Sequence, residues 1–417
     1  MTDTPDIPRF RFARFMPALL LLLTVFGPIS MDLYLPALPA LTEDLAAATS
    51  VAQLTVTACL VGLAAGQLTA GPLSDRYGRR GILLIGVVAY VVTSAVCAIS
   101  PSVELLIAAR LVQGLAGGVG IVISQAAGRD IHSGTALIRF YGRLTVVGGL
   151  AAIIGPLLGG LLNTFTDWRG LFVFLAVIGA ALLAISAFAF PETLPPGRRT
   201  TGGFAQTGRD FRVLLTDRVF LGAVLNQGLL YAALFAYLSG ATFVLQGIYG
   251  LSPQGYAAAF GLNSTGFMVF GWLAGRSAER WSIRGTLVVG VIVTGIGALG
   301  LLASGLAAMP LWVVIVSLFL LAGGVAISSP PATTLALADY PQIAGTASAL
   351  LGMVRFGFGG VSAPLVGVAG AATILPLGLV TTGSVVLAAV AYLALAARSH
   401  RGAAALPDAA PVTVPGS

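Results

Sequence analysis

Long apolar runs recur along almost the whole of this 417-residue chain and constrain its fold more than any other feature. An apolar helix needs about 20 residues to cross the roughly 30 Å of hydrocarbon in a bilayer. Only 9% of the residues are charged, against roughly 25% in a soluble domain. The sequence therefore predicts an all-α polytopic membrane protein with twelve transmembrane helices in two sets of six. These spans are expected near residues 16–38, 51–72, 81–99, 103–127, 138–162 and 169–190, then near residues 219–246, 254–275, 285–305, 309–335, 343–368 and 372–396.

A polar stretch rich in Pro and Arg, residues 191–217, separates the two sets. Such a composition is typical of a connection between compact units. It predicts a cytoplasmic linker between an N-terminal half, residues 16–190, and a C-terminal half, residues 218–397. A cytoplasmic N-terminal tail, residues 1–15, precedes the halves. The Ala- and Pro-rich C-terminal tail, residues 398–417, is expected to be disordered.

The arginines fall almost entirely on one side of the predicted bundle. With the N-terminus inside, 19 of the 22 basic residues lie in cytoplasmic segments, Arg169 lies outside, and Arg110 and Arg355 lie within spans. Short cytoplasmic loops carry such a positive excess. Both termini are therefore expected on the cytoplasmic side of a bacterial inner membrane, and the net charge of +7 needs no nucleic-acid partner to explain it.

Asp32 is a single carboxylate inside the first apolar run, between Pro28 and Pro36. An ionised Asp in hydrocarbon costs at least about 2.5–3.5 kcal/mol, so such residues usually face a protein interior or a watery cavity and serve a function. Burial also disfavours the charged form. Asp32 is therefore a candidate site for a proton or another cation. The alternative is that Asp32 only caps or braces a helix broken by the two prolines.

The sequence contains no pattern for binding a nucleotide, a metal or a flavin, so no cofactor is expected and ATP is not the energy source. Cys59 and Cys97 both lie in apolar segments and are expected to be small core residues. No nucleophile and base stand at a workable spacing in the spans, which argues against an enzyme.

The loop after the second predicted span, residues 71–81, contains Gly71, Asp75, Arg79 and Arg80. It resembles the signature loop of the major facilitator superfamily, Gly-x-Leu-x-Asp-Arg-x-Gly-Arg-Arg/Lys. The resemblance implies that Asp75 and Arg79 latch the cytoplasmic side in one conformation. The glycines permit a tight turn, and Asp75 is expected to accept bonds at a neighbouring helix N-terminus. Positive charge that serves only topology is the alternative explanation of the arginines.

Arg110, Gln113 and Gly114 in the fourth predicted span look like the superfamily's second motif, Arg-x-x-Gln-Gly. The resemblance associates Arg110 with proton transfer. At about 1.5 Å per residue, Arg110 lies about 12 Å and Asp32 about 9 Å from the outer ends of their helices, so they share a layer. A guanidinium beside Asp32 would favour the charged carboxylate, and making and breaking this contact would load and release a proton. A static ion pair is the alternative.

Several small residues in the fifth predicted span resemble the motif that distinguishes drug/proton antiporters within the superfamily. Glycines allow helices to pack closely, and a proline breaks the hydrogen-bond ladder and bends the helix. The resemblance implies export in exchange for protons, whereas ordinary helix packing is the alternative. The residues that match are Gly142, Gly155, Pro156, Gly159 and Gly160, while an alanine replaces one further glycine.

Residues 31–39, Met-Asp-Leu-Tyr-Leu-Pro-Ala-Leu-Pro, are similar to a stretch of the Bcr/CflA family, whose members export bicyclomycin, chloramphenicol and florfenicol, or sulfonamides. Residues 344–352 in the eleventh span also look like that family. The resemblance covers nearly the whole chain and makes Asp130 a candidate partner for Arg79. It is weaker in the C-terminal half, where Glu279 stands at the latch position.

Polar and aromatic side chains scattered through the spans are expected to line a central cavity suited to amphipathic drugs, although some will bond to other helices instead. Arg355, near mid-membrane, is expected to bind a polar or anionic group of the substrate or to act as a second counter-ion for Asp32, and a packing role is the alternative. The candidate substrate-binding residues are Tyr34, Gln53, Thr57, Asn226, Tyr231, Tyr237, Asn263 and Arg355.

Together these features predict a monomeric exporter in the lipid bilayer. It would exchange protons for a small amphipathic antibiotic of the phenicol or bicyclomycin type by rocking of its two halves. Two rival functions remain open. One is a proton-coupled uptake symporter for a small metabolite, and the other is a non-transporting sensor built on a transporter fold.

Overall fold

The computed structural model describes residues 16–131, 134–199, 203–277, 282–340, 343–367 and 373–396, and these residues are almost entirely helical. Eleven of their helices are long and apolar enough to cross a membrane, which confirms the prediction of an all-α polytopic membrane protein. Another helix, α6, is 29 residues long and lies in the same bundle. The arrangement agrees with two sets of six.

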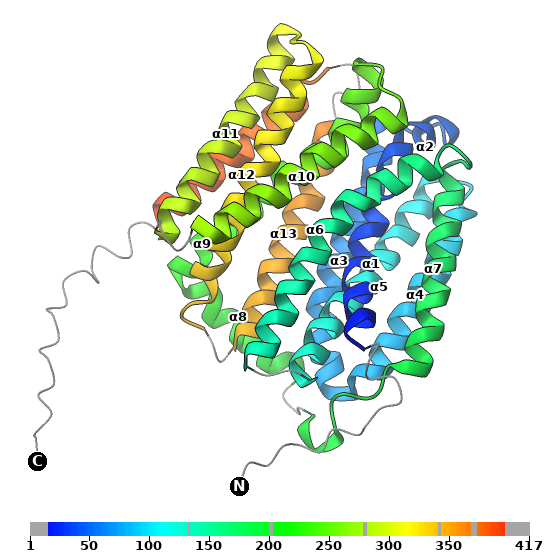
Figure 1. The fold of residues 1–417 in the computed structure, drawn as a ribbon, viewed down its shortest axis with the longest axis vertical. Coiled ribbons are helices and arrows are strands. Elements are labelled where there is room, and N and C mark those ends of the chain that lie inside the picture. The colour runs from blue at the N-terminus through cyan, green and yellow to red at the C-terminus, as the bar shows by residue number, and fades with distance from the viewer. Residues whose placement is uncertain are drawn as a thin grey trace, which may run out of the picture.

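The N-terminal half packs its long helices side by side, at the right of Figure 1. Glycines set the closest approach between α3 (Thr49–Tyr77) and α5 (Val103–Ile131). A Cβ atom on Gly62 would lie 2.1 Å from the Leu111 carbonyl oxygen, and one on Gly114 would lie 2.1 Å from that of Cys59. Only glycine fits such backbone contacts. The elements are α1 (Met16–Asp32), η1 (Leu35–Ala37), α2 (Leu38–Asp44), α3 (Thr49–Tyr77), α4 (Arg79–Ala98), α5 (Val103–Ile131), α6 (Gly134–Leu162) and α7 (Trp168–Ala189).

The C-terminal half repeats this construction at the left of Figure 1. Its α11 and α12 meet through glycines, because a Cβ atom on Gly297 would lie 2.5 Å from the Ser317 carbonyl oxygen. The elements are α9 (Arg218–Phe243), η3 (Val244–Ile248), α10 (Pro253–Ser277), α11 (Ile283–Ala307), α12 (Leu311–Leu337), α13 (Ala344–Gly367), α14 (Leu375–Ala391) and η5 (Tyr392–Ala396).

The linker between the halves contains a helix that the sequence analysis did not predict. After a short turn, η2 (Pro196–Arg198), α8 (Gly203–Thr216) packs against α3, α9 and α13. Asp217 then caps α9, since its Oδ1 accepts a hydrogen bond from the Val219 N–H (2.8 Å). Tyr340 donates to the other oxygen of Asp217 (2.7 Å), and burial together with this carboxylate raises the pKa of Tyr340 to about 12.

The first span is broken in its second half. Pro28 lies inside α1 without ending it, and the helix ends at Asp32. Pro36 has no N–H to donate to the Asp32 carbonyl four residues earlier, so the helical ladder cannot continue there. The chain instead forms η1 and restarts as α2. The break therefore coincides with the carboxylate that the sequence analysis singled out.

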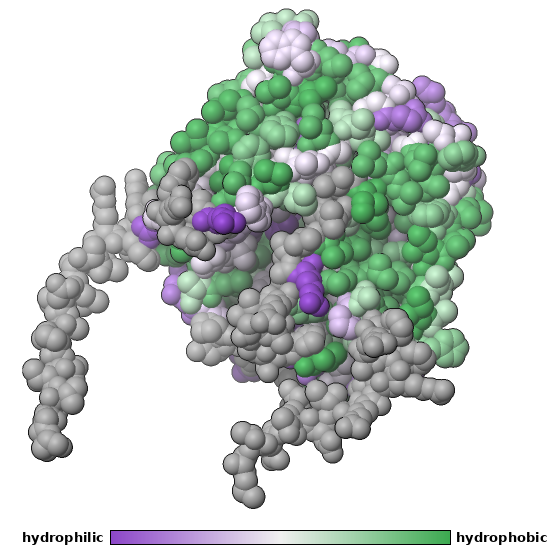
Figure 2. Space-filling view, viewed as in Figure 1, coloured by the Kyte–Doolittle hydropathy of each residue, from purple (hydrophilic) through white to green (hydrophobic). Residues whose placement is uncertain are grey.

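The outer surface of the bundle is apolar. Figure 2 shows hydrophobic side chains over most of the described surface in that view. Large apolar side chains stand free on it, including Ile85 (68% exposed), Phe188 (85%) and Trp312 (67%). A soluble monomer rarely exposes so wide an apolar surface, so this face is suited to lipid.

The halves touch along α3 with α13 and along α6 with α10. We call the end of the bundle that holds residues 71–81 the loop end, and the opposite end the far end. Four hydrogen bonds that join the two halves lie toward the far end. These bonds run from Thr242 Oγ1 to Leu35 O (3.0 Å), Gln246 Nε2 to Pro36 O (3.0 Å), Gln254 Nε2 to Gly160 O (3.4 Å) and Gln53 Nε2 to Ser239 O (3.4 Å).

Candidate functional site

Asp32 lies at the break in α1, and its side chain is buried. Its Cβ packs against α6 at Gly155, where an added Cβ would lie only 2.9 Å away. No hydrogen bond or ion pair joins the carboxylate to any other residue in the described ranges. A buried carboxylate without a protein partner is expected to take up a proton or a mobile cation.

The glycines of the fifth span hold this break in place. A Cβ atom on Gly159 would lie 1.8 Å from the Leu33 carbonyl oxygen, so the backbone of α6 touches the backbone just after Asp32. On the other side, a Cβ on Gly160 would lie 2.7 Å from Ala257 of α10. Pro156 lies inside α6, between Gly155 and Gly159 in the sequence. The side-chain surroundings of Gly142 are outside what the structure describes.

Arg110 on α5 is completely buried. Its Nη1 donates to Gln113 Oε1 (2.5 Å) and to the Ser30 carbonyl (3.3 Å). Its guanidinium carbon lies 4.4 Å from the centre of the Tyr34 ring and 5.5 Å from that of Phe172. Gln113 in turn donates to Ser94 on α4 (2.7 Å). The arginine is therefore held by aromatic faces and neutral oxygens.

The expected contact between Arg110 and Asp32 is not made. Both residues lie next to the broken part of α1, but the guanidinium bonds to Ser30 and stacks on Tyr34, on either side of Asp32 in the chain. The Cβ of Asp32 packs instead against Gly155 of α6. Tyr34 lies beyond the end of α1, so its ring and the Asp32 side chain need not share a face although the two residues lie at a similar depth. The static ion pair that the sequence left open is thus absent among the described residues.

Arg355 on α13 stacks on Tyr231 of α9, with its guanidinium carbon 3.9 Å from the ring centre. Its Nη2 also donates to the Tyr231 hydroxyl. The Nε atom is buried and has no partner within the described part of the chain. Arg355 is half-buried and forms no ion pair with Asp32 or any other described acid, so the expected role of counter-ion is not seen.

The remaining candidate substrate residues divide into two groups. Asn226 is buried and donates to the Ala388 carbonyl on α14 (3.0 Å), which favours a packing role. Gln53 bonds across the halves, and Thr57 donates to the Gln53 carbonyl (3.4 Å). Tyr237 on α9 and Asn263 on α10 form the second group and contact each other. The Asn263 amide donates to the Tyr237 hydroxyl (3.0 Å), and its own oxygen is left without a described partner.

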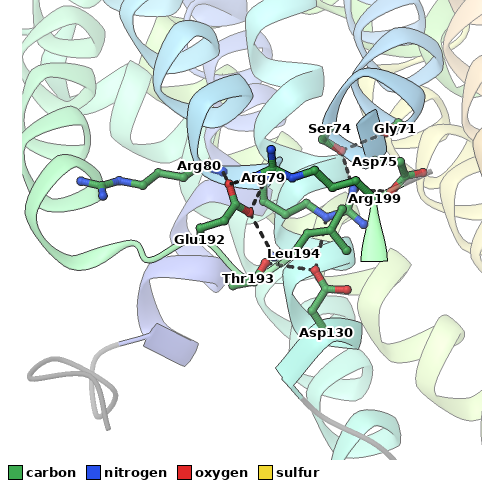
Figure 3. Close-up of polar contacts among 10 residues, drawn as sticks. All are labelled: Gly71, Ser74, Asp75, Arg79, Arg80, Asp130, Glu192, Thr193, Leu194 and Arg199. Carbon is green, nitrogen blue, oxygen red and sulfur yellow. Dashed lines mark hydrogen bonds and ion pairs between the residues drawn. The ribbon is translucent and has the colours of Figure 1, made fainter. Parts of the chain in front are cut away.

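At the loop end, Arg79 joins two acidic residues, as Figure 3 shows. Its Nη1 lies 2.6 Å from Asp75 Oδ1 and donates to Ser74 Oγ (2.5 Å). Its Nε lies 3.2 Å from Asp130 Oδ2 on α5, so the structure brings together the partners that the family resemblance implied. Thr193, after α7, donates to the same Asp130 oxygen (3.0 Å). This cluster ties α3, α4 and α5 to the start of the linker.

Glu192 completes the cluster and was missed in the sequence analysis. Its carboxylate accepts hydrogen bonds from the backbone N–H groups of Arg79 (2.8 Å) and Arg80 (3.4 Å), at the first turn of α4. A negative charge is stabilising at a helix N-terminus. Gly78 has φ of 100°, and a Cβ there would lie 2.3 Å from Glu192 Oε2. No local sequence motif could reveal this contact, because Glu192 lies 113 residues from Arg79.

The other loop residues are placed as follows. The Gly71 carbonyl accepts from Ser74 Oγ (2.9 Å), and Arg80 reaches the Ala187 carbonyl at the end of α7 (2.8 Å). Asp75 was expected to accept hydrogen bonds at a helix N-terminus, but it pairs with the Arg79 side chain. The N-terminus of α4 is bonded by Glu192 instead. Glu279, the corresponding acid of the C-terminal half, lies outside the described residues.

Comparison with known structures supports the fold. The nucleoside transporter NupG has a TM-score of 0.73 and 14% sequence identity, covering 92% of this chain and 99% of that one. A D-xylose–proton symporter has a TM-score of 0.69 and 15% identity, covering 92% of this chain and 96% of that one. At such identities the likeness shows a shared fold only.

Comparison of sequences identifies the family. YdgK of Bacillus subtilis, an uncharacterized MFS-type transporter, is 36% identical over 90% of this chain and 94% of its own. Multidrug resistance protein D of Escherichia coli is 30% identical over 92% of this chain and 96% of its own. A chloramphenicol resistance protein of Pseudomonas aeruginosa is 32% identical over 83% of this chain and 82% of its own. The model of the Major Facilitator Superfamily matches residues 20–364, and the chain therefore belongs to this superfamily of transporters.

Proposed function

We propose that the protein exports small amphipathic antibiotics in exchange for protons. The observation that carries this proposal is the buried Asp32 carboxylate, which has no described protein partner and lies at a helix break against Gly155 of α6. Relatives named for drug resistance, including resistance to chloramphenicol, support export and a substrate of the phenicol type.

The exchange follows from the position of Asp32. Its protonated form is neutral and suits an apolar surrounding, whereas its ionised form needs water or a cation. Because α6 touches both the break in α1 and α10 of the other half, a change of charge at Asp32 acts on the contact between the halves. Proton release and drug binding would then favour different arrangements of the halves, which is alternating access.

The hydrogen bonds between the halves describe one of these arrangements. They lie toward the far end, where Thr242 and Gln246 donate to carbonyls that follow the break in α1. The excess of arginines at the loop end supports a cytoplasmic location for that end and for both termini, in a bacterial inner membrane. The far end would then face outward and be closed. The Arg79 cluster would hold the loop end of the N-terminal half together during the exchange.

The test is proton movement driven by chloramphenicol in proteoliposomes that hold the wild type or Asp32→Asn. Asp32→Asn keeps the shape of the side chain and removes its titration. We expect drug-driven proton counterflow in the wild type and none in Asp32→Asn. Glu104→Gln, which removes an exposed acid at the start of α5, is the matched control and should behave as the wild type.

Three other results would each count against the proposal. Undiminished counterflow in Asp32→Asn would remove the coupling role of this residue. Proton flow in the same direction as the drug would support the rival symporter. Wild-type vesicles that move neither drug nor protons would favour the non-transporting sensor.

A further inference from the structure

The middle of the bundle carries an unbalanced positive charge. The sequence places Asp32 as the one acid, and Arg110 and Arg355 as two bases, inside predicted spans away from their ends. None of the three is ion-paired with another described residue. The surplus is one positive charge when Asp32 is ionised and two when it is protonated. Such an interior repels an organic cation and attracts electron-rich groups.

Arg355 is the base that can meet a ligand. Arg110 is fully buried under two aromatic rings, whereas Arg355 is half-buried and, in the described part of the chain, is held by Tyr231. The stack on Tyr231 fixes the plane of the guanidinium. Its Nη2 donates to the Tyr231 hydroxyl, while the buried Nε has no partner among the residues that the structure describes. A fixed guanidinium that forms no ion pair and keeps an unpartnered N–H is suited to an oxygen-bearing group of a ligand.

The surroundings of Arg355 orient it and supply an apolar wall. Gln227 Nε2 donates to Ser329 Oγ (3.0 Å) and to Thr333 Oγ1 (3.1 Å), and Ser329 lies 3.5 Å from the Tyr231 hydroxyl. This network ties α9 to α12 behind the tyrosine. Two phenylalanines continue the aromatic surface, with ring centres 6.2 Å apart for Tyr231 and Phe235 and 5.8 Å apart for Phe235 and Phe356.

We propose that Arg355 and Tyr231 form a subsite in the C-terminal half that binds an oxygen acceptor group of a neutral or anionic aromatic substrate, and that the protein discriminates against organic cations. Nitro, sulfonyl and carboxylate groups have the required acceptor oxygens, and the aromatic row beside Arg355 takes the ring that bears them. This inference rests on the proposed export function and names the chemical class of its substrate.

The subsite is tested by equilibrium binding to the purified protein in detergent, without a membrane or a gradient. The probes are chloramphenicol, which carries a nitro group, florfenicol, which carries a methylsulfonyl group, and the cation tetraphenylphosphonium. The variants are Arg355→Gln, which removes the charge, and Arg355→Lys, which keeps the charge but not the planar fork. Arg209→Gln on the exposed side of α8 is the matched charge-loss control.

Removing a charge-assisted hydrogen bond is expected to weaken binding of both acceptor probes by about 10- to 100-fold in Arg355→Gln. Arg355→Lys should lie between Arg355→Gln and the wild type, and Arg209→Gln should match the wild type. The wild type should bind tetraphenylphosphonium at least about tenfold more weakly than chloramphenicol. A melting curve with the wild-type midpoint for Arg355→Lys shows that its weaker binding is not misfolding.

Equal affinities in the wild type and Arg355→Gln would overturn the subsite. Binding of the cation as tightly as chloramphenicol, or failure of the wild type to bind either acceptor probe, would also overturn it. A different result would refute the antiport proposal. Binding that depends on Arg355 with no proton counterflow in vesicles would refute antiport and leave the subsite standing.

Discussion

Each half of the bundle places an arginine on the face of a tyrosine, but the two stacks differ in what surrounds them. In the N-terminal half, Arg110 lies over Tyr34 at 4.4 Å and is completely enclosed. In the C-terminal half, Arg355 lies over Tyr231 at 3.9 Å and remains half-buried. Two carbonyl oxygens and two aromatic rings hold the first arginine, whereas one tyrosine among the described residues holds the second.

The difference separates two uses of a charge inside a membrane. A desolvated cation–π contact contributes about 2 kcal/mol or more, so the enclosed Arg110 stabilises the bend of α1 that presents Asp32. A ligand cannot reach it without repacking Tyr34 and Phe172. Arg355 is only half-buried and is therefore partly accessible to a ligand. The N-terminal half thus holds a rigid frame around its acid, and the C-terminal half holds an available base.

The largest change in the free energy of unfolding is expected where α6 contacts the broken part of α1. In Gly159→Ala the new methyl carbon would lie 1.8 Å from the Leu33 carbonyl oxygen, and backbone cannot rotate away. Overpacking of this kind costs about 3 kcal/mol, which exceeds the roughly 1 kcal/mol that Ala gains over Gly within a helix. Equilibrium unfolding in mixed micelles measures the loss. Gly148→Ala on the same helix meets nothing within 4 Å and should be neutral or stabilising.

If Gly159→Ala were as stable as Gly148→Ala, α1 would not be clamped by α6, and the rigid frame around Asp32 would be refuted. A drop in stability shared by both variants would point instead to a general intolerance of α6 to alanine.

A smaller effect is expected beside the second stack. In Gly228→Ala on α9, the methyl group would lie 2.4 Å from Val354 Cγ1 and 2.8 Å from a Phe358 ring carbon, on either side of Arg355 in α13. Side chains can adjust where backbone cannot, so the loss should be about 1 kcal/mol. The same unfolding assay compares it with Gly159→Ala. A larger loss for Gly228→Ala would reverse the proposed order of rigidity between the halves.

The fold was predictable because each span can be recognised by its length and apolar composition, and α9 to α14 repeat the pattern of the first six spans. The position of the α1 break follows from Pro36, whose missing N–H leaves the Asp32 carbonyl without its helical partner. The helix in the linker was missed because α8 is short and mixed in composition, and it owes its place to packing against α3, α9 and α13.

The pairing of side chains was less predictable than the spans. Depth along a helix placed Arg110 and Asp32 in one layer, but depth carries no information about facing, and the two residues point to different neighbours. Glu192 was missed because its partners, the first N–H groups of α4, are backbone atoms that leave no motif in the sequence. The Arg355 stack depends in the same way on the angle between α9 and α13.

The smallest changes in stability and binding are expected when the hydroxyl of each stacked tyrosine is removed, and these changes distinguish the two stacks most clearly. Tyr34 Oη is hydrogen-bonded to Thr55 Oγ1 (2.9 Å), so Tyr34→Phe should cost about 1 kcal/mol of unfolding free energy and preserve the ring under the guanidinium. Tyr231 Oη accepts from Arg355 itself. Tyr231→Phe should therefore change stability less than Tyr34→Phe but weaken chloramphenicol binding about threefold, because Arg355 is less well oriented. Unfolding and binding measured on both variants check the contrast. A Tyr231→Phe variant that loses stability and keeps full affinity would show that the second stack, like the first, is part of the frame.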